Sequence, residues 1–345
     1  MISFLEQEIM EQPAAIQRLI DAEQASIIPT VAELMGKFNY VLIAARGTSD
    51  NAARYAQYLF QIVNHIPVAL ATPSVFSMYQ QPPKLDGALA IGISQSGQSP
   101  DIVSVLTEAR KQGRPTIAVT NEVHSPLAQT ADVIIPLQAG TELAVAATKT
   151  YTTSLTAMAL LSYGMSGDAA MLAAIRQLPV WVEQTLALNL PLVGRMERFR
   201  FMEHGAVIGR GYNYATAFEI ALKVKELTGV TTVPYSSADF LHGPVASVKP
   251  GYPVLAIAHQ GVMFTDTLEL IEKADGLGAE LVVISDSPKA RALADLALPI
   301  PEGIPEWLSP VVDVLPGQIL GWQMAVSRGL NPDKPKGLSK VTETL

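Results

Sequence analysis

Short apolar runs alternate with longer amphipathic segments along most of the chain, and this alternation predicts the fold. The runs at 40–45 and 88–93 are built from Val, Ile, Leu and Ala with little polar alternation, which is typical of parallel strands covered on both faces. Segments with helical spacing follow them, for example 100–112. This alternation favours βαβ units in a doubly wound parallel sheet.

The same pattern occurs twice. Residues 39–49 are echoed by 205–213, 88–99 by 254–266, and 116–137 by 281–300. The Arg-Gly pairs that end the first two runs begin at Arg46 and Arg210, which are 210 − 46 = 164 positions apart. Because solenoid repeats span only ~20–50 residues, a repeat of this length indicates a duplicated domain.

Five segments follow from these patterns. Two α/β domains are expected at 38–167 and 201–330. Residues 1–37 are predicted to be helical with an interruption at Pro13, and 168–200 to be linking helices. Residues 331–345 contain two prolines and a glycine without helical spacing, so an extended tail is expected.

Composition narrows the class of protein. Only 16% of the 345 residues are charged and the net charge is -8, so nucleic acid and anionic membranes are not expected partners. The sequence has no cysteine, which excludes disulfides, thiolate metal sites and cysteine nucleophiles. It shows neither a secretory signal nor a run of ~18 apolar residues. A cytoplasmic soluble protein is expected.

A serine-rich loop is the strongest local signal for ligand binding. The segment SQSGQS (94–99) follows an apolar strand, and Ser99 is expected to cap a helix that begins at Pro100. Hydroxyls and free N–H groups at such a helix start bind phosphate without a basic side chain; an ordinary polar loop is the alternative. The matching second-half segment, AHQGVMFTD (258–266), lacks the serines, so phosphate binding is predicted only in the first half.

Two further polar turns have open interpretations. Thr48 and Ser49 follow the strand at 40–45 and would either cap a helix or contact a ligand. The segment 140–154 is predicted to begin a helix that is capped by Thr141, with Glu142 in its first turn.

A candidate acid–base helix spans 214–229. Glu219, Lys223 and Glu226 share one helical face; alone, this spacing is typical of a solvated ladder of ion pairs. The helix follows an apolar strand, at the edge where open α/β sheets bind ligands, and this favours an active-site role. His242 precedes a Gly-Pro pair and is either structural or an acid–base group.

Seven motifs in this order resemble the sugar-isomerase (SIS) family, and within it the isomerase half of glucosamine-6-phosphate synthases. They are EQEIMEQPAAI, RGTS, SQSGQSPD, GTELAVAATKTYTT, FEIALKVKE, DFLHGP and GLSK, and together they cover essentially all of the chain. The resemblance implies an α/β fold of two tandem SIS domains, each a three-layer αβα sandwich with a parallel sheet. It also implies a homodimer or higher oligomer with shared active sites.

The resemblance further implies a role for each matching residue. The sugar phosphate would be held by Thr48, Ser49, Ser94, Gln95, Ser96 and Ser99, with Val145 beside the sugar. Glu226 would move the proton between C1 and C2, assisted by Lys223. His242 would open the sugar ring in a neighbouring subunit's site. Lys340 would form an imine with the ketose, in a tail that becomes ordered once substrate binds. Ala147 replaces a serine of the synthase pattern, so one sugar contact is lost.

A reaction follows from the same resemblance. Synthases carry a glutaminase domain with a cysteine nucleophile, whereas this sequence has neither. We therefore expect a deaminase that converts glucosamine 6-phosphate to fructose 6-phosphate and ammonia, without metal or cofactor. The alternatives are a deglycase of fructosamine-type ketosamine phosphates, an ammonia-dependent isomerase that forms glucosamine 6-phosphate, and a non-catalytic sugar-phosphate sensor. A sensor would have no use for Glu226, Lys223 and Lys340 together.

Overall fold

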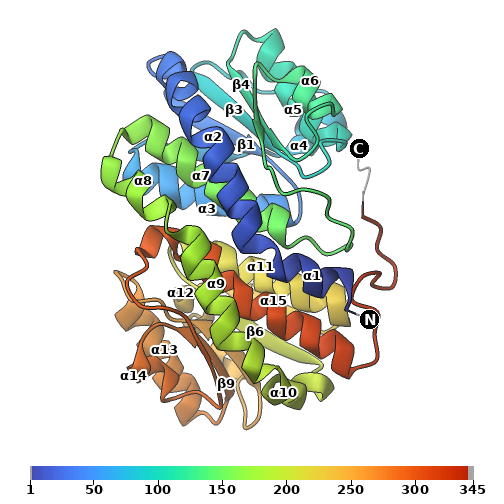
Figure 1. Ribbon diagram of the computed structural model, residues 1–345, viewed down its shortest axis with the longest axis vertical. Helices are drawn as coiled ribbons and strands as arrows, with labels where there is room; N and C mark the ends of the chain where they lie inside the picture. Colours follow the sequence, from blue (N-terminus) through green and yellow to red (C-terminus); the bar gives the residue numbers. More distant parts are fainter. Residues whose placement is uncertain (1, 341–345) are drawn as a thin grey trace. The chain divides into compact units, whose positions relative to one another are not determined.

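A computed structural model describes residues 2–340 (Figure 1). The chain divides into two compact units, each with one β-sheet. The first-sheet unit contains residues 14–142, 149–176 and 339–340, and the second-sheet unit contains residues 2–13, 143–148 and 177–338. The division does not follow the order of the chain, because the loop 143–148 and the tail up to Leu338 belong with the second sheet.

The first sheet has five parallel strands in the order β2-β1-β3-β4-β5. Their bounds are β1 (Tyr40–Ala44), β2 (Val68–Leu70), β3 (Ala88–Ile93), β4 (Thr116–Thr120) and β5 (Val133–Pro136). Every residue of β3 is buried, as its continuous apolar run predicts for a central parallel strand.

Two groups of helices flank this sheet. The helices are α2 (Gln12–Leu34), α3 (Thr48–Val63), α4 (Pro73–Ser77), α5 (Pro100–Lys111), α6 (Pro126–Thr130), α7 (Lys149–Ser166) and α8 (Ala169–Ile175). Helix α3 packs against α7, whereas α5 packs against α4 and α6.

The second sheet repeats this plan with the strand order β10-β9-β8-β6-β7. Its strands are β6 (His204–Ile208), β7 (Thr231–Tyr235), β8 (Pro253–Ile257), β9 (Glu280–Ser285) and β10 (Leu296–Pro299). The helices of this unit are α1 (Phe4–Met10), α9 (Leu178–Asn189), α10 (Val193–Met196), α11 (Asn213–Thr228), α12 (Ser237–Leu241), α13 (Phe264–Gly276), α14 (Pro288–Arg291) and α15 (Ser309–Ser327).

The two sheets confirm both the predicted α/β class and the internal duplication. When β6–β10 are matched to β1–β5, the strand orders are identical. The matched ion pairs follow the same plan: Arg46 pairs with Asp101 in the first turn of α5, and Arg210 pairs with Asp266 in the first turn of α13. Each pair ties the loop after the unit's first strand to the helix that follows its third strand.

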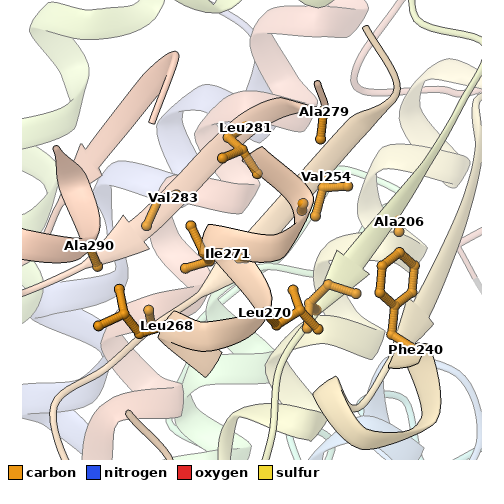
Figure 2. Close-up of a cluster of buried hydrophobic side chains, with 14 of the residues drawn as sticks. Ala206, Phe240, Val254, Leu268, Leu270, Ile271, Ala279, Leu281, Val283 and Ala290 are labelled. Atoms are coloured by element: carbon orange, nitrogen blue, oxygen red, sulfur yellow. The ribbon is translucent and has the colours of Figure 1, made fainter. Parts of the chain in front are cut away.

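An apolar core fixes each helix on its sheet. In the second-sheet unit, Leu268, Leu270 and Ile271 of α13 lie in one buried cluster with Leu281 and Val283 of β9 (Figure 2). Complete burial of a Leu or Ile side chain contributes roughly 1.5–3 kcal/mol, so three such residues hold the helix firmly. A matching cluster joins Ile102, Val105 and Leu106 of α5 to the first sheet. Both helix N-termini are thereby held at the carboxyl edge of their sheets.

The segments outside the sheets are largely helical. Helix α1 ends at Met10 and α2 starts at Gln12, so Pro13 lies in the first turn of α2, where its missing N–H does no harm. Residues 168–200 include α8, α9 and α10 with short 3-10 turns. Among residues 2–340, no helix is both long and apolar enough to cross a bilayer.

Candidate active site

The serine-rich loop connects β3 to α5, and its hydroxyl groups differ in their hydrogen bonds. Ser94 Oγ accepts a hydrogen bond from the Gly97 N–H at 3.1 Å, and Ser96 Oγ accepts one from the Gln98 N–H at 3.3 Å. Ser99 is the N-cap of α5, as predicted, yet its side chain makes no capping hydrogen bond within the described part of the chain. The loop therefore presents an uncommitted hydroxyl at a helix start.

Gly97 is required at its position in this loop. Its φ is +61°, in the left-handed region, and a Cβ there would collide with Ser125 Oγ. Only glycine adopts this conformation without strain and lets the loop approach the N-cap of α6 so closely.

Thr48 and Ser49 do not cap their helix. Gly47, with φ +55°, is the N-cap of α3, and both residues lie in the first turn. Arg46 Nε donates to the fully buried Asp101 Oδ2 at 2.7 Å, which brings the start of α3 and the start of α5 to one side of the first sheet. The capping interpretation is therefore wrong for both residues, and half-buried hydroxyls at a helix start suit anion binding.

The loop 140–148 differs from the predicted helix start. Helix α7 begins at Lys149 rather than at Thr141. Glu142 is buried and reaches that helix from upstream: Oε1 accepts from the Thr150 N–H at 3.1 Å and Oε2 from Thr150 Oγ1 at 2.8 Å. Lys340 Nζ lies 2.8 Å from the same Oε2. The acid expected in a first turn is thus the centre of a buried polar cluster.

A pocket of about 600 Å³ lies at the carboxyl edge of the first sheet. Gln95, which follows β3, and Asn121, which follows β4, line it together with Glu142 and Arg18. In an open parallel sheet this is the edge at which ligands bind. Gln95 of the serine-rich loop and Glu142, the partner of Lys340, therefore line one pocket within the first-sheet unit.

The predicted acid–base helix is α11, and its charged face is buried rather than solvated. The side chains of Glu219 and Lys223 are 0% and 1% exposed, whereas that of Glu226 is 24% exposed. Lys223 Nζ lies 2.5 Å from Glu226 Oε2 and 3.5 Å from Glu219 Oε1. A solvated ladder is therefore excluded; a buried ammonium held between two carboxylates suits proton transfer.

Glu226 is the open end of this triad. It lines a pocket of about 790 Å³ with residues of the tail, among them Asn331, Lys334 and Lys336. Val145 lies in the same unit, and its N–H donates to the Asp333 carbonyl at 3.1 Å. His242 ends α12, is exposed, and does not line this pocket.

The predicted site residues thus fall into two groups. Thr48, Ser49, Ser94, Gln95, Ser96, Ser99 and Lys340 belong to the first-sheet unit, and Val145, Lys223, Glu226 and His242 to the second-sheet unit. Ala147 belongs to the loop of Val145. Among residues 2–340, no group of three or more His, Asp and Glu side chains is arranged to hold a metal ion.

The matching loop of the second-sheet unit holds a carboxylate of its own. Glu306 Oε2 accepts from the Val262 N–H at 2.9 Å, and Oε1 lies 3.4 Å from the Met263 N. A Cβ on Gly261 would collide with this carboxylate. Glu306 therefore fills the place, at the start of α13, that corresponds to the serine-rich loop of the first half.

A buried ion pair lies behind that loop. His259 Nδ1 lies 3.2 Å from Asp313 Oδ2, and Nε2 contacts the Ile304 carbonyl at 2.9 Å. Burial lowers the pKa of His259, but the charge and hydrogen bond of Asp313, with smaller effects of Asp286 and Ile304, raise it to about 9. Burial also raises the pKa of Asp313, against the pull of His259. The geometry favours the ion pair, since Asp313 Oδ2 also accepts from Asn213 Nδ2 at 2.9 Å.

Glu142 and Glu306 are the residues that sequence reasoning missed. Glu142 belongs to the GTEL motif, but its spacing from Thr141 suggested an ordinary helix start. Glu306 lies 306 − 262 = 44 positions after the Val262 that it contacts, and no local pattern links the two. The one related signal in the sequence is that residues 258–266 lack the serines of the first-half loop.

Comparison with known proteins agrees with this geometry. The model of the SIS domain matches residues 37–162 and 203–328, one match for each sheet. The chain is 34% identical over 343 residues to the glutamine–fructose-6-phosphate aminotransferase [isomerizing] of Pyrococcus horikoshii, covering 98% of this chain and 57% of that relative. The chain thus spans little more than half the length of that protein.

Two solved structures cover nearly the whole chain. The C-terminal domain of the glucosamine-fructose-6-phosphate aminotransferase of Francisella tularensis superposes with a TM-score of 0.90 at 28% identity, over 97% of this chain and 99% of that one. A candidate phosphosugar isomerase from Silicibacter pomeroyi gives a TM-score of 0.87 at 32% identity, over 96% and 100%. Together with the two domain matches, they confirm the resemblance drawn from the motifs: the chain belongs to the SIS-domain family, with two SIS domains in tandem.

Proposed function

We propose that this chain is a phosphosugar isomerase that deaminates glucosamine 6-phosphate to fructose 6-phosphate and ammonia. The observation that carries the proposal is the buried triad on α11. Lys223 is 1% exposed and lies 2.5 Å from Glu226. A buried ammonium is costly unless it is paired, so Lys223 pairs with Glu226 and orients this carboxylate, which lines the pocket.

An oriented carboxylate supports proton transfer between neighbouring carbons. In the open-chain sugar, Glu226 takes the proton from C2 and returns it to C1, while the amine nitrogen loses a proton and O1 gains one. The double bond thereby moves from C1–O to C2–N. Water then adds to the C2 imine and ammonia leaves, so one glucosamine 6-phosphate and one water give one fructose 6-phosphate and one ammonia. A positioned base of this kind contributes on the order of 10²–10⁴ in rate.

The remaining groups have matching roles in the proposal. The loop 94–99 and the hydroxyls of Thr48 and Ser49 hold the phosphate, and Val145 lies beside the sugar. Lys340 forms an imine with the ketose, and His242 opens the ring in a neighbouring subunit. The isomerising aminotransferase among the relatives supports a fructose 6-phosphate ligand.

The substitution Glu226→Gln tests this role directly. The side chain keeps its size, and Lys223 keeps its contact with Glu219 at 3.5 Å, so the fold should survive. In D₂O the variant should still bind fructose 6-phosphate but should exchange a C1 proton of this sugar at least 10²-fold more slowly, as followed by proton NMR. Glu269→Gln, on the exposed face of α13, is the matched control. Normal exchange in Glu226→Gln rules out the assignment.

The products distinguish the alternatives. The wild-type chain should release ammonia from glucosamine 6-phosphate, with galactosamine 6-phosphate and fructosamine 6-phosphate as comparators. A deglycase would prefer the fructosamine phosphate, and an aminating isomerase would form glucosamine 6-phosphate from fructose 6-phosphate and ammonia. A sensor would bind a sugar phosphate without turnover, and this outcome would overturn the enzymatic proposal.

A further inference from the structure

Lys340 forms an ion pair with Glu142, a residue that has no role in the proposed mechanism. Its Nζ lies 2.8 Å from Glu142 Oε2, and the two side chains are 24% and 0% exposed. Both residues belong to the first-sheet unit. The contact joins positions that are 340 − 142 = 198 residues apart.

Glu142 is itself held rigidly. Its two oxygens accept hydrogen bonds from the N–H and the hydroxyl of Thr150, the second residue of α7. The partial positive charge of a helix N-terminus adds to this. The carboxylate therefore has one fixed position, and so does any cation that pairs with it.

Burial gives the contact its strength. A fully buried carboxylate is destabilised when a counter-charge is removed from it. Lys340 supplies a counter-charge to Glu142, in addition to the two hydrogen bonds from Thr150. This contact between the tail and the fold involves only the protein's own charges.

The Lys340 amine contacts a residue of the pocket at the carboxyl edge of the first sheet. Glu142 and Gln95 line the same pocket of about 600 Å³, and Gln95 belongs to the serine-rich loop. A phosphosugar held by that loop would extend toward the wall on which Lys340 is anchored.

We infer that Glu142 is the positioning residue for Lys340: it docks the end of the tail and remains the counter-ion when the amine reacts. The second part rests on the proposed function. In that step the ammonium and the C2 ketone give a protonated imine and one water. The cation is conserved, because the charge of the ammonium becomes the charge of the protonated imine. Glu142 can therefore stay paired throughout, and no new charge has to be buried.

The docking part is tested on the full chain without sugar. Hydrogen–deuterium exchange of residues 336–340 should rise at least tenfold in Glu142→Gln. The faster exchange should not extend back along the chain beyond Asp333, because the carboxylate of Asp333 accepts a separate hydrogen bond from the Leu5 N–H at 2.8 Å. Lys340→Gln breaks the pair from the tail side and should give the same rise if Glu142→Gln folds poorly. Lys340→Arg keeps the cation and should stay near wild type, as should Glu122→Gln, which removes an exposed carboxylate of the same pocket.

The positioning part is tested by trapping. Borohydride with fructose 6-phosphate should label Lys340 in the wild type, at least tenfold less in Glu142→Gln, and not at all in Lys340→Arg. Unchanged tail exchange in both Glu142→Gln and Lys340→Gln overturns the inference. Faster exchange with undiminished trapping overturns the positioning role. Faster exchange without any adduct in the wild type refutes the imine of the proposed function, while Glu142 still stands as the residue that docks the tail.

Discussion

The serines of the loop 94–99 differ in what they do for the fold, and this difference separates binding from stability. Ser94 and Ser96 each accept a backbone N–H within the loop, so their removal would also disturb its shape. Ser99 occupies the N-cap of α5, and its side chain makes no capping hydrogen bond among residues 2–340. Its hydroxyl is the group that a ligand can use at the lowest structural cost.

Ser99→Ala is therefore expected to weaken sugar-phosphate binding while sparing stability. A hydrogen bond to a charged phosphate contributes about 1.5–3 kcal/mol, which corresponds to a tenfold or greater loss of affinity for fructose 6-phosphate in calorimetry. The thermal midpoint should change little. Ser104→Ala on the same helix, whose hydroxyl donates to the Asp101 carbonyl, is the control and should bind normally. An unchanged affinity in Ser99→Ala would remove Ser99 from the phosphate site.

The ion pair of His259 and Asp313 predicts a pH dependence of stability. The pKa of His259 is raised from 6.5 to about 9 in the folded protein, so the charged form stabilises the fold below pH 6.5 and this contribution is lost as pH rises through 9. The shift corresponds to a contribution on the order of 3 kcal/mol. The thermal midpoint of the wild type should therefore fall as the pH rises from 6.5 to 9, and the midpoint of His259→Asn should fall less over the same range. Parallel profiles for the two proteins would show that the pair does not stabilise the fold.

Among the secondary-structure elements, α11 and α15 pack closely against each other through two glycines of α15. Gly317 of α15 lies against Ile220, and a Cβ there would collide with the Ile220 side chain. Gly321, one turn later, faces Leu227 with more room, because its Cβ would lie 3.2 Å from Leu227 Cδ1. Since α11 carries Lys223 and Glu226, these glycines set the position of the proposed base.

Gly317→Ala should destabilise the protein relative to Gly321→Ala. Alanine gains about 1 kcal/mol of helix propensity at either position, but overpacking at Gly317 costs about 1–3 kcal/mol. Thermal unfolding should give a lower midpoint for Gly317→Ala, and Ile220→Val in the same chain should recover part of the difference. A midpoint for Gly317→Ala at or above that of Gly321→Ala would contradict this account of the packing.

Elements with strong local signals were predictable from the sequence, and contacts between distant residues were not. The start of α5 at Pro100 and the end of α11 before Gly229, with φ +74°, agree with the sequence. The start of α7 does not, because the capping group is Glu142, eight residues before Thr150. A contact between a carboxylate and a helix across a loop produces no periodic pattern in the sequence. Burial also depends on distant residues, so the spacing of Glu219, Lys223 and Glu226 predicted their shared face but not its burial.

For the whole molecule, the proposal of shared active sites predicts complementation. Glu226→Gln and His242→Ala should each be inactive alone. If a site uses Glu226 of one subunit and His242 of another, an equal mixture of the two variants that exchange subunits as dimers should regain about a quarter of the wild-type rate. Tagged subunits would verify the exchange. Verified exchange without recovered activity would mean that His242 serves the site of its own chain.

Glu306 also affects how many ligands one chain can take up. Two halves built alike would suggest two equivalent places for a phosphate, yet only the first ends in a serine-rich loop, and the second already contacts a carboxylate at 2.9 Å from Val262. The two halves therefore have the same strand order, but only the first half is expected to bind a phosphate. Calorimetric titration with fructose 6-phosphate should saturate at one equivalent per chain. Two equivalents would mean that the sugar phosphate displaces Glu306, and that both halves of the molecule remain in use.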